Sequence, residues 1–175
     1  IISKLNNLIK KVTENFDKYN PGVGVLAIED FFINDFSLWY IRRSRERFHS
    51  HNSDRGEAVK TFYFVLLGLV KLIAPVMPFF AEEMYQIIKT EKMEESVHLL
   101  SWPEINKKQI DQKLEEKMRL VRSLVNQVLA ERMVLGIKVR QPLAELKIKN
   151  SDLKKDKDLL ELIKNKINII NELDL

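Results

Sequence analysis

The stretch VLAIEDFFINDFSLWYIRRSRERFH, residues 25–49, lies at the centre of this chain's organisation. It is long, mostly apolar and free of Pro and Gly, and it therefore predicts one uninterrupted helix. At about 100° of turn per residue, one apolar stripe runs along that helix. Phe31 and Leu38 fall on another face, so the helix is expected to have neighbours on more than one side. The stripe consists of Val25, Ile28, Phe32, Phe36 and Trp39.

The same helix becomes strongly basic at its C-terminal end. Four arginines follow one another with Glu46 as the single acid among them: Arg42, Arg43, Arg45 and Arg47. Helical phase places Arg42 and Arg45 on an outward face. Arg43 continues the apolar stripe and is therefore assigned to the structural core together with Phe32, Phe36 and Trp39. Two interpretations remain open: a solvated helix end, where cations suit the helix dipole, or a surface that grips phosphate oxygens.

Composition favours a mainly helical protein. The 175 residues include 45% hydrophobic residues, five Gly and five Pro, enough for one domain with a small appendix. The absence of Cys excludes disulfides and thiolate metal sites and fits a reducing compartment, so a cytoplasmic location is expected. A net charge of +4 permits a nucleic-acid partner. The longest apolar run, Phe62–Val70, is too short to cross a bilayer.

Periodicity and breaking residues divide the chain into two parts. Residues 1–136 are predicted to form a helical bundle, and residues 137–175 a linker and a small α+β subdomain that the end of the chain truncates. The chain begins inside an amphipathic pattern without Met, as an excised piece of a longer protein would. The expected helices are Ile1–Phe16, Val25–His49, Glu57–Ala74, Phe79–Lys89, Ile110–Leu135 and Leu153–Lys166; Glu94–Glu104 is an extended strap, and Leu143–Lys149 and Ile167–Leu173 are strands.

A second basic segment, RMVLGIKVRQPL, spans Arg132–Leu143. Gly136 is expected to stop the preceding helix. Lys138 and Arg140 then occupy alternate positions of an extended segment, so their side chains project to one side. Such a segment can lie along a nucleic-acid strand, or it can be a linker between the two parts of the chain.

The residues give no support for a catalytic or metal site in this chain. His49 and His51 are two positions apart, His98 is distant, and no Cys accompanies them, so no metal site is expected. The acidic pairs at 82–83 and 94–95 consist of adjacent residues, which do not converge on one point of a helix. The sequence contains no Gly-rich phosphate loop, serine elbow or dinucleotide motif.

Four segments occur here in one order: WYIRRSRERF (39–48), APVMPFFAEEMYQ (74–86), ESVHLLSWPE (95–104) and GIKVRQPL (136–143). Together they resemble the C-terminal region of isoleucyl-tRNA synthetases, class I enzymes, over nearly the whole chain. The second and third segments resemble valyl and leucyl relatives equally, whereas the first and fourth look specific for the isoleucyl branch. Ile2–Asn6 (ISKLN) resembles the start of the family's first helix in this domain.

The resemblance implies an α-helical anticodon-binding domain that packs on the anticodon stem of tRNA(Ile). Combined with the predicted geometry, it identifies Arg42, Arg45, Lys138 and Arg140 as tRNA contacts. The family's HIGH and KMSKS motifs are absent here, so this fragment is not expected to catalyse ligation or to hold a cofactor. The parent enzyme is expected to be an isoleucine–tRNA ligase that uses ATP and magnesium and acts as a monomer, with its catalytic domain in the same chain.

One departure from the family pattern falls beside the second basic segment. The family often has an Ala-Ala-Arg-Asn run there, where this chain has Ala130–Met133 and an apolar continuation to Leu135. Two alternatives also stand beside the main interpretation: a helical protein-interaction module with a basic face, and the equivalent domain of a valyl- or leucyl-tRNA synthetase. The salt dependence of binding separates the first alternative, because phosphate contacts release counterions.

Overall fold

A computed structural model describes residues 1–49, 54–147 and 156–174 of the chain. It is mainly helical, as predicted, and consists of two compact units, Ile1–Asp111 and Gln112–Leu175. The units divide before the long helix α6 (Gln112–Val134), earlier than the predicted division at residue 136, because α6 packs on α7 (Lys157–Ile167) of the second unit. In the described part of the chain, no helix is long and apolar enough to cross a membrane.

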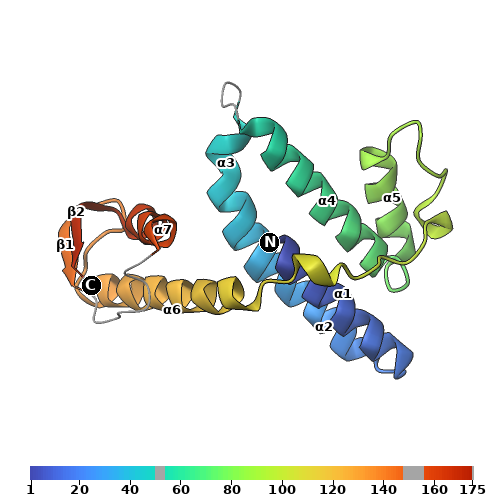
Figure 1. Ribbon diagram of the computed structural model, residues 1–175, viewed down its shortest axis with the longest axis horizontal. Helices are drawn as coiled ribbons and strands as arrows, with labels where there is room; N and C mark the ends of the chain where they lie inside the picture. Colours follow the sequence, from blue (N-terminus) through green and yellow to red (C-terminus); the bar gives the residue numbers. More distant parts are fainter. Residues whose placement is uncertain (50–53, 148–155, 175) are drawn as a thin grey trace. The chain divides into compact units, whose positions relative to one another are not determined.

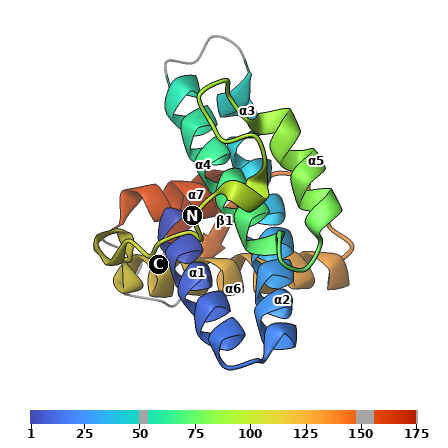
Figure 2. The same ribbon diagram turned by 90° about the vertical axis from the view of Figure 1, so that its right-hand side faces the viewer.

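The first unit is organised around a continuous helical run, visible in Figure 1 as one rod from α2 to α3. α1 and α2 form an antiparallel hairpin, and α4 packs on both α1 and α3 before contacting α5 (Figures 1 and 2). Pro78 opens α5 at its first position, as predicted. The elements are α1 (Ile2–Asp17), α2 (Pro21–Asp30), η1 (Phe31–Ile41), α3 (Arg42–Phe48), α4 (Arg55–Ile73), α5 (Pro78–Ile88), η2 (Val97–Leu99) and η3 (Lys107–Gln109).

The middle of the rod, η1, is a π-helix rather than an α-helix. Hydrogen bonds from i to i+5 widen each turn, so side chains return to the same face after more residues than in an α-helix. The buried residues of η1 are Phe31 and, four and five positions later, Asp35 and Phe36, and the buried residue of α3 is Ser44.

The structure corrects two of the predicted core assignments. Phe32 is 48% exposed and Arg43 is exposed, so the prediction that both belong to the core is wrong. Phe36 is buried and Trp39 is half-buried. Phe31, which α-helical phase placed on a separate face, is only 3% exposed and lies in the main core.

An irregular strap after α5 is held to the helices by side chains. The Nε1 of Trp102 donates to the Oγ1 of Thr13 at 2.8 Å, and the indole packs 5.9 Å from the ring of Phe16. Nearer α5, the Glu82 carboxylate accepts hydrogen bonds from the Ser96 hydroxyl at 2.7 Å and from the Val97 amide at 3.0 Å. The predicted strap is therefore observed, with the short 3-10 turn η2 inside it, and its contacts join two segments of the family resemblance.

The second unit combines α6 and α7 with a two-stranded parallel sheet. β1 (Leu143–Lys147) pairs with β2 (Ile169–Asp174), and α7 is the crossover that parallel neighbours require. The predicted strand–helix–strand order is confirmed. Residues 148–149 of the predicted first strand and 153–155 of the predicted helix lie outside the described residues. The apolar faces of the two helices are buried at Val121, Val125, Val128, Leu159, Leu162, Ile163 and Ile167.

Candidate nucleic-acid interface

The basic end of the rod presents two arginines on one face of α3. Arg42 and Arg45 are three positions apart and both exposed, whereas Ser44 between them is buried. Among the residues that the structure describes, no carboxylate forms a salt bridge with either guanidinium. These two side chains are therefore available to an anion from outside the first unit.

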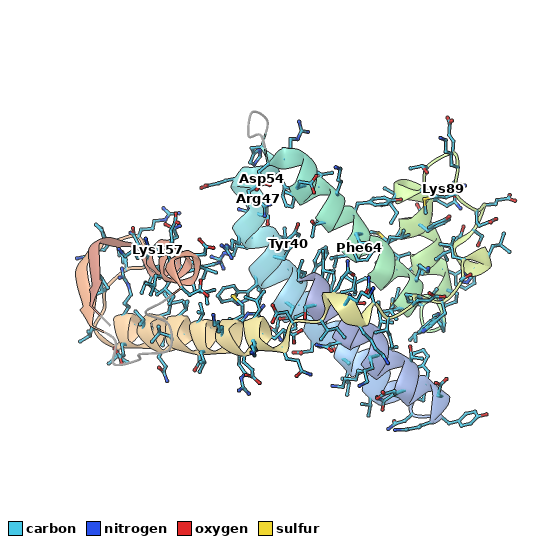
Figure 3. The ribbon with its side chains drawn as sticks, in the orientation of Figure 1. Tyr40, Arg47, Asp54, Phe64, Lys89 and Lys157 are labelled. Carbon is cyan, nitrogen blue, oxygen red and sulfur yellow. The ribbon has the colours of Figure 1, made fainter. Side chains whose placement is uncertain are left out.

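Arg47 has a different environment from Arg42 and Arg45. Its Nε lies 2.5 Å from the Oδ2 of Asp54, just before α4, and this hydrogen bond raises the pKa of Arg47 above its ordinary value. Figure 3 shows both side chains at the end of α3, with Tyr40 lower on the same rod. Arg47 therefore links α3 to α4, a role that sequence reasoning did not foresee because helical phase names no partner in a neighbouring helix.

Aromatic contacts fix the same end of the rod against α4. The Tyr40 hydroxyl donates to the Ala58 carbonyl oxygen at 3.0 Å, and burial raises the pKa of that hydroxyl. The Phe48 ring meets those of Tyr40 and Phe62 edge-on, at 6.5 and 5.7 Å between centroids. The backbone that carries Arg42 and Arg45 is thus held in place by packing on the opposite face.

The second basic segment begins at a glycine-terminated helix. The amide of Gly136 donates to the Met133 carbonyl at 3.2 Å, and that of Ile137 donates to the Arg132 carbonyl at 2.9 Å. With Gly136 at φ +69°, these two bonds make a Schellman cap, which requires a residue that tolerates the left-handed region. The predicted stop of the helix at Gly136 is confirmed.

After the cap the chain forms a turn and not the predicted extended segment. The Gln141 amide donates to the Lys138 carbonyl at 2.9 Å, closing a tight turn. Lys138 and Arg140 are nevertheless both exposed. We call residues Ile137–Pro142 the basic loop. The prediction of an extended segment at Lys138–Arg140 is wrong, because the carbonyls of this loop accept hydrogen bonds from within the unit.

Arg132, on the last turn of α6, lies beneath this loop. It is 2% exposed, and its guanidinium donates to backbone carbonyls of the basic loop and of α7. At helical spacing Arg132 continues the stripe of Val121, Val125 and Val128, and a cation on an apolar stripe is a signal that the sequence carries. Asn168, which also donates to the loop, carried no signal because its partner is 28 residues away.

The structure describes two of the three histidines, and they lie on separate segments of the chain. His49 and His98 are exposed, and His51 lies outside the described residues. A group of three or more His, Asp or Glu side chains suited to a metal ion does not occur within the described ranges. The arrangement that the structure offers is therefore one of exposed cations, Arg42 and Arg45 in the first unit and Lys138 and Arg140 in the second, which can bind anions by charge-assisted hydrogen bonds.

Comparison with known proteins identifies the family of the chain that carries these cations. Residues 1–148 match the family described as the anticodon-binding domain of tRNA ligase. The chain belongs to this family, which confirms the resemblance seen in its four segments.

Individual relatives point to one branch of the family. The chain is 43% identical over 158 residues to an isoleucine–tRNA ligase of Clostridium novyi, an alignment that covers 87% of this chain and 15% of that protein. It is 38% identical over 178 residues to an isoleucine–tRNA ligase of Cytophaga hutchinsonii, covering 97% of this chain and 16% of the relative. The chain thus spans about one-sixth of the length of these relatives. The similarity favours the isoleucyl branch over a general protein-interaction module.

Proposed function

We propose that this chain binds tRNA(Ile) as the anticodon-binding domain of an isoleucine–tRNA ligase, with Arg42, Arg45, Lys138 and Arg140 on the phosphate backbone of the anticodon stem. The observation that carries the proposal is the family match over residues 1–148, within which all four exposed cations lie. The 38–43% identity to isoleucine–tRNA ligases supports the choice of tRNA.

The physical basis is the exposure of these side chains. An exposed guanidinium loses little hydration before contact, and its planar fork matches two phosphate oxygens at once. No described carboxylate forms a salt bridge with Arg42 or Arg45, in contrast to Arg47, which is bonded to Asp54. Arg42 and Arg45 are therefore the members of the cluster best suited to bind phosphate.

In this proposal the chain supplies binding and the remainder of the parent protein supplies chemistry. The parent attaches isoleucine to its tRNA, and ATP and magnesium bind to its catalytic domain, in the same chain. We further propose that it acts as a monomer in the cytoplasm. Nothing in these assignments requires a catalytic group among the residues described above.

The experiment is a tRNA(Ile) titration at several salt concentrations, performed on the parent protein. The variants are Arg42→Ala/Arg45→Ala and Lys138→Ala/Arg140→Ala. Each phosphate contact that is lost should flatten the slope of log K against log salt by about 0.9, so each double variant should flatten it by roughly one to two units.

A matched control removes the same charge from cations that already have partners. Lys10→Ala/Lys60→Ala deletes two exposed lysines that lie 3.9 Å from Glu14 and 2.8 Å from Glu57, respectively. The control should leave the slope unchanged. If it flattens the slope as much as the two basic variants do, net charge alone explains binding and the proposed contacts are wrong.

A further inference from the structure

The buried guanidinium of Arg132 is hydrogen-bonded to backbone carbonyls through its Nη1 and Nη2. Its Nη1 donates to the Ile167 carbonyl at 3.2 Å, and its Nη2 donates to the carbonyls of Lys138 at 2.7 Å and Val139 at 3.3 Å. The Gln141 carbonyl accepts a further bond from the same Nη2. Within the described residues no carboxylate forms a salt bridge with this guanidinium.

The remaining carbonyl of the turn is held by a second side chain. The Nδ2 of Asn168 donates to the Arg140 carbonyl at 3.0 Å. All four carbonyls from Lys138 to Gln141 therefore accept bonds from Arg132 or Asn168. The side chains of these four residues are all exposed, so the loop is anchored by its backbone and presents its side chains outward.

The position is an unfavourable one for a cation. The preceding positions of the same helix stripe are filled by Val121, Val125 and Val128, all buried. A buried charge without an acid loses its hydration and must recover that free energy from hydrogen bonds. Ile167 ends α7, and the partial negative charge of a helix C-terminus offsets part of this loss. A methionine would fill the space without that cost, but it would remove the donor of the Val139 and Gln141 carbonyls.

We propose that Arg132 is a positioning residue that preforms the basic loop, so that Lys138 and Arg140 meet tRNA phosphates without an ordering step. This inference rests on the proposed function of those two cations. A loop that must be ordered on binding loses affinity through lost conformational freedom. The guanidinium reaches the loop through Nη2 and the end of α7 through Nη1, whereas the ammonium of a lysine has a single nitrogen and cannot make both sets of bonds in this fixed geometry.

The first test measures the loop without tRNA. Trypsin cleaves after Lys138 and Arg140 only if the loop leaves its anchored conformation, so the cleavage rate at these two bonds, followed by mass spectrometry in the parent protein, reports the anchoring. Arg132→Met and Arg132→Lys should both raise that rate about tenfold or more. Val121→Ala removes a buried side chain eleven positions earlier on the same helix. For the same loss of unfolding free energy, it should raise the cleavage rate much less than the Arg132 variants do.

The second test is a double-mutant cycle on tRNA(Ile) affinity. Arg132→Lys should weaken binding by about tenfold in the natural sequence, an effect of the size expected for ordering two long side chains. In the Lys138→Ala/Arg140→Ala background the same change should have almost no effect, because the groups that Arg132 positions are gone. A merely structural role would weaken binding equally in both backgrounds.

A milder variant covers the case in which Arg132 substitutions unfold the unit. Asn168→Gly keeps the left-handed backbone at φ 55° and removes only the amide that holds Arg140. It should raise the rate of trypsin cleavage after Arg140 and weaken tRNA binding, both by a smaller factor than the Arg132 variants do.

Three results would overturn the inference. The first is an unchanged trypsin cleavage rate in every variant at Arg132 or Asn168. The second is an Arg132→Lys variant with the cleavage rate and tRNA affinity of the natural sequence. The third is an equal loss of affinity on Arg132→Lys in the natural and the Lys138→Ala/Arg140→Ala backgrounds. Unchanged affinity of Lys138→Ala/Arg140→Ala with faster cleavage in Arg132→Met would instead show that the loop is anchored but does not contact tRNA. That result rejects the proposed function of the loop.

Discussion

The two basic segments of this chain are held in place by different means. On α3, the exposure of Arg42 and Arg45 follows from helix phase and from apolar packing on the opposite face, spread over many residues. In the basic loop, the exposure of Lys138 and Arg140 depends on hydrogen bonds from two side chains, Arg132 and Asn168. A surface built on packing should resist single polar substitutions, whereas one built on a few hydrogen bonds should depend on each donor.

The largest expected effect tests the packing of the rod. Phe36 is 1% exposed and stacks on Tyr40 and Phe62, at 6.0 and 5.4 Å between ring centroids. Phe36→Ala should lower the free energy of unfolding by about 3–5 kcal/mol. Phe32→Ala, the matched control at a half-exposed phenylalanine, should cost about 1 kcal/mol. Chemical unfolding of both variants measures the difference. Equal losses of unfolding free energy would mean that Phe32 is as buried as Phe36, which contradicts the structure.

A smaller effect is expected at the cap that leads into the basic loop. Gly136 has φ +69°, and apart from its chain neighbours no residue comes within 4 Å of the position that a Cβ would take, so Ala there meets backbone strain without a clash with another part of the fold. Gly136→Ala should cost about 1–2 kcal/mol in unfolding free energy. Gly22 is equally open but has no positive φ, and Gly22→Ala should be neutral or slightly stabilising. Similar losses in the two variants would mean that the cap does not depend on the left-handed residue.

How far the sequence predicts these features depends on what determines each one. The stop at Gly136 and the helix start at Pro78 follow from the backbone preferences of single residues, and both are observed. The burial of Phe31 rather than Phe32 does not follow, because the predicted stripe started from Val25, whereas Phe31 is in phase with the buried Ala27 and Ile28 of α2. Arg42 and Arg45 were found from charge and helical phase, whereas Lys138 and Arg140 were found from charge and an extended backbone that is in fact a turn. The anchoring of the loop was not, because the partners of Arg132 are carbonyls, which every residue has.

The smallest effect concerns acid, to which each unit should respond through a different carboxylate. In the first unit, hydrogen bonds from Gln86 and then Ser96 hold the pKa of Glu82 below its ordinary value of 4.5. In the second, a hydrogen bond from Lys117 at 3.0 Å does the same for the pKa of Asp156, just before α7, whose ordinary value is 3.8. A carboxyl whose pKa is lowered by folding stabilises the folded state fully above its ordinary pKa. That stabilisation is lost as the pH falls through the lower, folded value.

Substitution of either carboxylate should therefore remove part of the acid sensitivity of its own unit only. Asp156→Asn should flatten the fall in stability below about pH 4 for α7 and the basic loop, while Glu82→Gln should do so for α5 and the strap. Amide hydrogen exchange at several acidic pH values, followed separately in the two units, measures this, and each variant serves as the control for the other. Because the basic loop is anchored partly through the C-terminal end of α7, Asp156→Asn should also reduce the acid-induced rise in exchange at the Gln141 amide. If each variant changed the exchange of both units equally, acid would destabilise the protein through its net charge and not through these two carboxylates. The two basic segments would then not differ in their response to acid.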